Sequence, residues 1–281
     1  MRLIAAIIVL VISGMQAAAA LSIPIAEVAH IHGIAFDPTQ AGRVLLATHL
    51  GLYRTTGDGN AEIVSSDTSD YMGFTPHPTD AGLLYASGHP AGGGNLGFIV
   101  SRDGGVTWEQ MSLGVGGPVD FHALTISLAD PRTLYGLYGG IQSSRDGGET
   151  WIVAGPGPER VFDLAASAQR AEELYAGTAT GLWVSFDAGK SWQRIGPEGI
   201  PVTMVEVAPD GSLYAYYVGN GLFRRSASEG SWSGLAGDQV AGAFLHLAVD
   251  PTDPQHLFAV TEAIPVIESR DGGINWAPLA D

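Results

Sequence analysis

The 281-residue chain contains no cysteine, and Lys190 is its only lysine. Without cysteine, disulfides, thiol nucleophiles and thiolate metal sites are all excluded. The 13 basic residues stand against 29 acidic ones, which gives a formal net charge of −16. Such a chain repels a phosphate backbone, so nucleic acid is excluded as a partner, whereas cationic ligands, metals included, are favoured.

Long apolar runs are also scarce beyond the first residues. Met1–Ala20 begins with Arg2, continues with the apolar run Leu3–Ile12 and ends in the small residues Ala17–Ala20. This order is typical of a secretory signal peptide. We therefore predict a signal peptide over residues 1–20, no membrane span in the mature chain, and a periplasmic or secreted protein.

One short phrase with the pattern Ser-x-Asp-x-Gly-x-x-Trp returns along the chain. Four good copies span Ser101–Trp108, Ser144–Trp151, Ser185–Trp192 and Ser269–Trp276, and a degenerate fifth spans Ser226–Trp232. Successive tryptophans are 40 to 44 residues apart. A period of this size, built from short strands and turns, indicates radial repetition of β-sheets.

The phrase has the physics of a tight hairpin turn. Its aspartate accepts hydrogen bonds from turn N–H groups, its glycines supply positive φ, and its tryptophan buries a large ring. It resembles the Asp-box (BNR) motif. That resemblance implies a β-propeller in which these aspartates are structural and lie far from any catalytic face; they are Asp103, Asp146, Asp187 and Asp271.

Six segments share one skeleton of four short strands. We expect their inner strands to begin near His32, Met72, His122, Phe162, Thr203 and Leu245. The sequence therefore predicts an all-β protein in which residues 21–281 form a single domain, a six-bladed β-propeller. The first segment lacks an Asp-box, and Ile23–Val28 is expected to complete a sheet edge and help close the ring.

Histidines gather where the repeats differ from one another. Aligned blades bring the start of each inner strand and the end of each second strand to one mouth of the central channel. The residues predicted to meet there are His30, His32, His49, Met72, His89 and His122. Imidazole and thioether ligands favour copper, and zinc is possible, with Asp70 or Asp120 as a further ligand or second-shell acceptor.

The other histidines are assigned structural roles. His246 is one residue out of register with His32 and is expected to face a neighbouring blade. His77 and His256 lie beside loops and are expected to be solvated. Any single strand histidine is more often hydrogen-bonded within the fold than bound to a ligand.

Three functional interpretations follow. The chain resembles an exported bacterial group of six-bladed Asp-box propellers described as sialidase-like or glycosylhydrolase-like, on segments that include His30–Gly33, Gly88–Pro90 and Asp120–Ala123. The arginines of a sialidase site are absent. Our first interpretation is a non-catalytic propeller that binds copper. The alternatives are a glycoside hydrolase that uses Asp120 and Asp70, and a protein-binding assembly scaffold.

Overall fold

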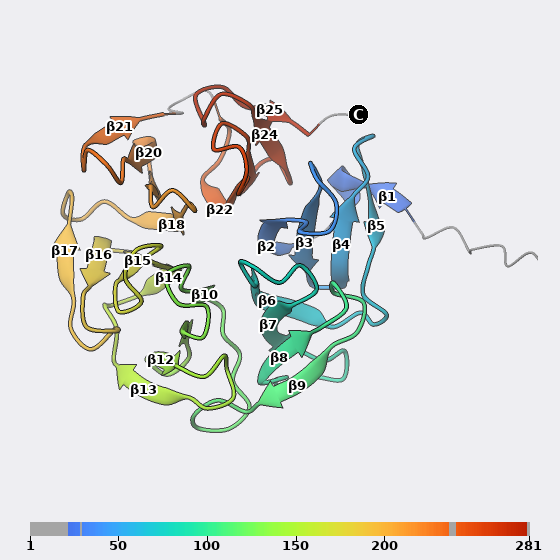
Figure 1. The fold of residues 1–281 in the computed structure, drawn as a ribbon. Coiled ribbons are helices and arrows are strands. Elements are labelled where there is room, and N and C mark those ends of the chain that lie inside the picture. Colours follow the sequence, from blue (N-terminus) through green and yellow to red (C-terminus); the bar gives the residue numbers. More distant parts are fainter. Residues whose placement is uncertain (1–21, 29, 236–239, 280–281) are drawn as a thin grey trace, which may run out of the picture.

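The computed structural model describes residues 22–28, 30–235 and 240–279, and in them the strands form six sheets arranged as blades around a central axis (Figure 1). The prediction of an all-β, six-bladed propeller is confirmed. The predicted signal peptide lies outside the described residues. Within the described ranges, no helix is both long and apolar enough to cross a bilayer.

The first three blades run from the N-terminal side of the chain. Blade one contains β1 (Ser22–Pro24), β2 (Ile31–Phe36), β3 (Val44–Thr48), β4 (Gly51–Thr55) and β5 (Asn60–Ile63). Blade two contains β6 (Asp70–Pro76), β7 (Leu84–His89), β8 (Phe98–Ser101) and β9 (Glu109–Ser112). Blade three contains β10 (Leu124–Ile126), β11 (Leu134–Leu137), β12 (Ile141–Ser144) and β13 (Ile152–Gly155).

The last three blades repeat the same antiparallel order. Blade four contains β14 (Val161–Ala166), β15 (Leu174–Thr178), β16 (Gly181–Ser185) and β17 (Gln193–Ile195). Blade five contains β18 (Val202–Val207), β19 (Leu213–Tyr217), β20 (Gly221–Arg225) and β21 (Trp232–Gly234). Blade six contains β22 (Phe244–Val249), β23 (Leu257–Thr261), β24 (Ile267–Ser269) and β25 (Ala277–Pro278).

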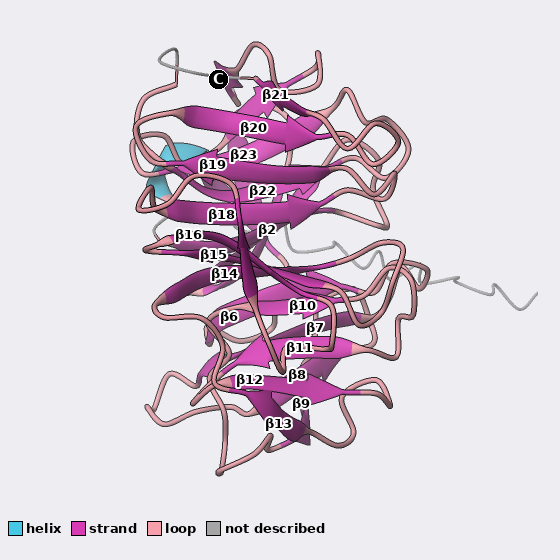
Figure 2. Ribbon diagram, turned by 90° about the vertical axis from the view of Figure 1, so that its left-hand side faces the viewer, coloured by secondary structure: helices cyan, strands magenta, loops and turns pink. Residues whose placement is uncertain are grey.

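The first strand of each segment lies at the axis. These inner strands are β2, β6, β10, β14, β18 and β22, and each contacts the inner strands on both sides of it (Figure 1). Apolar side chains of adjacent blades pack together, so the described core consists of six clusters, one between each pair of neighbours. The side view shows loops on both faces of the resulting disc (Figure 2).

The ring closes between blades one and six by packing, because every strand of blade six comes from its own segment. β1 adds a fifth, outer strand to blade one by pairing with β5. The short 3-10 helix η1 (Ile25–Glu27) follows, and Ile25 and Val28 are buried against Phe258 and Val260 of blade six. The expected role of Ile23–Val28 at a sheet edge and in closure agrees with this arrangement.

The Asp-box turns have nearly identical hydrogen bonds. In the copy at Asp146, the carboxylate accepts bonds from the Ser144 hydroxyl at 2.7 Å, the Thr150 N–H at 2.9 Å and the Thr150 hydroxyl at 2.6 Å. The indole of Trp151 donates to the Gly148 carbonyl at 3.1 Å. The carboxylates of Asp103, Asp187 and Asp271 accept the same backbone N–H bond from the residue four positions further on. These aspartates therefore hold turns closed.

Candidate functional site

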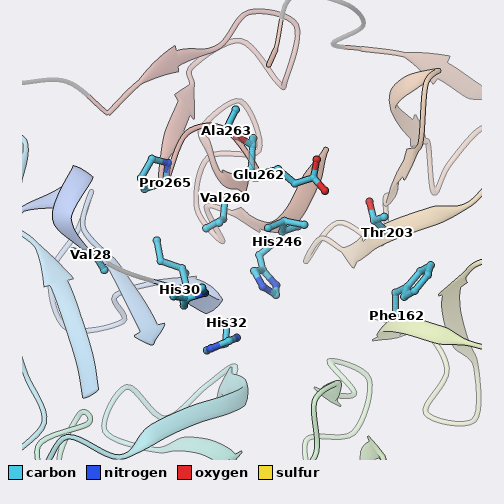
Figure 3. A pocket seen from close by; sticks show the side chains of 13 residues that line it. Val28, His30, His32, Phe162, Thr203, His246, Val260, Glu262, Ala263 and Pro265 are labelled. Atoms are coloured by element: carbon cyan, nitrogen blue, oxygen red, sulfur yellow. The ribbon is translucent and has the colours of Figure 1, made fainter. Parts of the chain in front are cut away.

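The channel mouth lies at the face opposite the Asp-box turns, where the inner strands begin. In four blades the first residues of the inner strand carry a register shift, so one residue is left out of the ladder: His32, Phe162, Thr203 or Leu245. A bulge of this kind redirects a side chain away from the regular alternation. All four residues line one cavity of about 550 Å³ at the mouth (Figure 3).

A first cluster at the mouth joins blades one and two. Nδ1 of His49 lies 2.7 Å from Oδ2 of Asp70, and Nε2 of His32 lies 3.6 Å from Oδ1 of the same carboxylate. The rings of His32 and His49 are 4.3 Å apart between centroids. Burial lowers the pKa of His32, and the Asp70 carboxylate opposes that shift. We call His32, His49 and Asp70 the first triad.

A second cluster has the same composition. Nε2 of His89 lies 3.1 Å and Nε2 of His122 lies 2.7 Å from Oδ2 of Asp120. The hydrogen bond with Asp120 raises the pKa of His122, against the effect of burial. We call His89, Asp120 and His122 the second triad. The triads are neighbours, because Asp70 and His89 are directly opposed in the β6–β7 ladder.

The remaining predicted ligands are placed differently. His30 is exposed, has a φ of 48°, and its ring lies 4.8 Å from that of His49. Met72 is buried in β6. The structure therefore brings the five predicted histidines, with Asp70 and Asp120, to one mouth. Thioether coordination by Met72 stays a prediction.

His246 joins this mouth, although sequence reasoning left it out of the cluster. Its ring points into the cavity beside His30 and His32, with Phe162 and Thr203 across from them (Figure 3). Ile31 and His32 of blade one line the same cavity. Burial, together with the neighbouring His32, lowers the pKa of His246 to about 4.

Two carboxyl groups lie deeper in the channel, in a cavity of about 890 Å³. Burial raises the pKa of Asp163 to about 7, although its carboxylate accepts N–H bonds from Leu164 and Val205 at 2.9 Å each. Burial and the charge of Asp163 raise the pKa of Glu206 to about 8. The sequence signal was only that both residues lie on inner strands.

The prediction that His256 is solvated is wrong. Its side chain is buried, with Nδ1 3.3 Å from Asp250 and Nε2 2.8 Å from Glu268. Its ring packs on Phe36 of blade one, at a centroid distance of 5.1 Å. His256 therefore ties the two ends of the ring together. His77, by contrast, lies at a surface turn and accepts the Asp80 N–H.

The chain is similar to known proteins in sequence and in fold. No family model matches the chain. A curated xyloglucanase from Paenibacillus sp is 26% identical over 299 residues, which cover 89% of this chain and 26% of the relative. The chain thus spans about a quarter of the length of that curated relative.

Solved propellers share the fold at low identity. A GH74 enzyme of Niastella koreensis has a TM-score of 0.64 at 18% identity, over 88% of this chain and 45% of that one. The GH74 xyloglucanase of Xanthomonas campestris has a TM-score of 0.61 at 22% identity, and the match covers 92% of this chain and 46% of that one. YCF48 bound to D1 peptide has a TM-score of 0.56 at 18% identity, and the match covers 91% of this chain and 84% of that one. These likenesses confirm the expected β-propeller fold.

The comparisons correct our first functional interpretation. The curated relative is a carbohydrate hydrolase, and two of the structural neighbours carry the GH74 name. These names favour the glycoside hydrolase alternative, so the interpretation of a non-catalytic, copper-binding propeller is wrong. The role as an assembly scaffold stays a prediction, because the likeness to the peptide-bound YCF48 shows the fold alone.

Proposed function

We propose that this chain is a glycoside hydrolase that acts on a polysaccharide at the channel mouth, with Asp70 and Asp120 as its carboxyl pair. The observation that carries the proposal is the placement of these two acids. Both lie at one mouth, on adjacent blades, and each has two imidazole nitrogens within 3.6 Å of its carboxylate. The similarity to a curated xyloglucanase supports the same class of reaction.

Hydrolysis of a glycosidic bond needs two carboxyl groups on either side of the scissile bond. One donates a proton to the leaving oxygen, and the other activates water or attacks the anomeric carbon. Asp120 is only 8% exposed at its side chain, so its partners fix its orientation. Because it is the more enclosed of the two acids, Asp120 is assigned as the base or nucleophile. Asp70, which is 17% exposed at its side chain, takes the role of acid.

Aromatic side chains at the mouth supply surfaces for sugar rings. Phe162 is 44% exposed in the wall of the mouth cavity, and Tyr138 is 37% exposed in the turn between β11 and β12. The Asn95 amide, in the glycine-rich loop after β7, lies 3.4 Å from the Tyr138 hydroxyl. Exposed rings of this size commonly mark binding sites, because leaving them in water is unfavourable.

The test is turnover of polysaccharides by the purified chain. Xyloglucan and a panel of other β-linked glucans are incubated with the protein, and newly formed reducing ends are measured. Replacing Asp120 with Asn is expected to lower kcat by about 10²–10⁴-fold, because the isosteric amide can neither accept the proton nor attack. Asp70→Asn is expected to have a comparable effect.

The matched control is Glu149→Gln, an exposed acid in an Asp-box turn on the opposite face. It removes one negative charge far from the mouth, so kcat should stay unchanged. Absence of turnover on every polysaccharide, or full activity in Asp120→Asn, would overturn the proposal.

A further inference from the structure

We infer that each triad is a binding site for a divalent cation of the zinc class, and that occupancy suppresses hydrolysis. Binding is argued from geometry and does not depend on the proposed hydrolase activity. Suppression rests on that proposed function, because the triads contain its carboxylates.

The donor atoms of each triad converge on one point. In His32, His49 and Asp70, one nitrogen or oxygen from each residue lies within 4.8 Å of the other two, and the same holds for His89, Asp120 and His122. Zinc binds imidazole nitrogen and carboxylate oxygen at about 2.0–2.2 Å. Small rotamer changes would therefore bring all three donor atoms within bonding distance of one cation.

Unpaired buried atoms at the triads are an independent observation. Nε2 of His32, Oδ1 of Asp70 and Oδ1 of Asp120 are buried and make no hydrogen bond. In the described residues five buried side-chain atoms share this property, and three of them belong to the triads. Such atoms are costly unless something pairs with them. Asp120, whose side chain is more than nine-tenths buried, faces both imidazoles of the second triad with Oδ2 and leaves its buried Oδ1 without a partner.

The ligand chemistry selects the cation class. Two neutral imidazoles with one carboxylate suit late first-row divalent metals, whereas calcium and magnesium prefer oxygen ligands alone. Three protein ligands leave at least one position for water, as in open zinc sites. His30 lies beside the first triad, at 4.8 Å from the His49 ring, and could supply a fourth ligand there.

Occupancy and hydrolysis require the same oxygens. A carboxylate that donates its electron pair to a cation neither accepts a proton nor attacks a sugar. A bound cation also disfavours protonation of its ligands, so the acid of the pair would be lost as well. The cation is therefore expected to act as a reversible inhibitor.

The binding test uses the purified chain after dialysis against a chelator. Zn²⁺ is titrated against a chromophoric competitor, and Co²⁺ is added in a parallel experiment to read ligand geometry from its visible absorption. We expect the wild-type chain to bind two equivalents of Zn²⁺ in competition with the chromophore. His49→Ala and His122→Ala should each bind one equivalent, and the double variant should bind none under the same conditions.

The matched control is His77→Ala, because His77 is a histidine on the opposite face, and it should keep two equivalents. Melting temperatures of all variants without metal establish that they are folded. Zn²⁺ should raise the melting temperature of the wild-type chain and not that of the double variant. Two equivalents retained by the double variant, or none bound by the wild type, would overturn the inference.

The two proposals fail separately. If no polysaccharide is cleaved but Zn²⁺ binds with the expected stoichiometry, only the hydrolase and its suppression are lost. If hydrolysis occurs and Zn²⁺ at saturation of both sites leaves its rate unchanged, the binding sites stand and suppression is wrong.

Discussion

Aspartates lie at both faces of the disc, and their partners differ in origin. The carboxylate of Asp146, in an Asp-box turn, is held by groups within four residues of it in the chain. That of Asp70, at the channel mouth, is hydrogen-bonded to His49 of the neighbouring blade, and His32 of the same blade lies 3.6 Å away. Local partners stabilise one turn, whereas partners from another blade form a site only after the ring has assembled.

The two halves of the mouth also differ in the side chains that they present. Blades one to three bring the imidazoles and carboxylates of the triads to it, whereas blades four and five contribute Phe162 and Thr203. The Asp-box turns of blades two, three, four and six are nearly the same. A repeated feature therefore reports on folding, and a departure from the repeat reports on ligands.

The largest expected effect on stability comes from comparing a good Asp-box copy with the degenerate one. Trp151 is 9% exposed, and its ring packs on Phe98 and Phe121 at centroid distances of 5.2 and 4.8 Å. Trp151→Ala should lower the free energy of unfolding by about 3–5 kcal/mol. Trp232, in the degenerate copy, is 37% exposed.

Trp232→Ala is the control and should cost less than about 1 kcal/mol, because the ring already contacts water. Urea unfolding of both variants at neutral pH measures the difference. Equal losses in the two variants would mean that the Asp-box tryptophan is not what joins the blades.

A second prediction concerns pH and the deep channel acids. The pKa values of Asp163 and Glu206, about 7 and 8, lie above the value near 4 of an unfolded carboxyl group. Their neutral forms suit the channel, so this stability is fully present below about pH 4 and is lost as pH rises through 7 to 8. The free energy of unfolding should therefore fall between about pH 4 and pH 8.

Glu206→Gln should reduce that fall and stabilise the protein at pH 8 by roughly 2–4 kcal/mol relative to the wild type. Urea unfolding at intervals from pH 4 to 8 tests this. If the free energy of unfolding falls with pH as steeply in Glu206→Gln as in the wild type, groups other than Glu206 cause the fall.

The repeat predicts most of the fold, because each blade is specified by its own turns and strands. The inner strands begin where the copies predict, as β2, β14, β18 and β22 illustrate. The Asp-box aspartates are identified by the same local signal. These signals are local, so they can be identified without knowing which distant residues are in contact.

The site was predicted less completely, because it depends on bulges and on closure of the ring. A register shift after Phe244 breaks the alternation of β22, so His246 reaches the cavity that His32 lines. His256 is buried by Phe36, a residue of the first blade that the local sequence around His256 does not reveal. Longer-range packing decides both positions.

The smallest effect tests the Asp-box turn at acid pH. Hydrogen bonds from Thr150 and Ser144 lower the pKa of Asp146 to about 2, although partial burial acts to raise it. The stability that these bonds contribute is present above about pH 4 and is lost as pH falls through 2, opposite in sign to the channel acids. Asp146→Ala should cost about 1–2 kcal/mol at pH 7 and close to nothing at pH 2, as urea unfolding would measure. A cost that stays constant down to pH 2 would mean that the side chain stabilises the turn by packing and not through its charge.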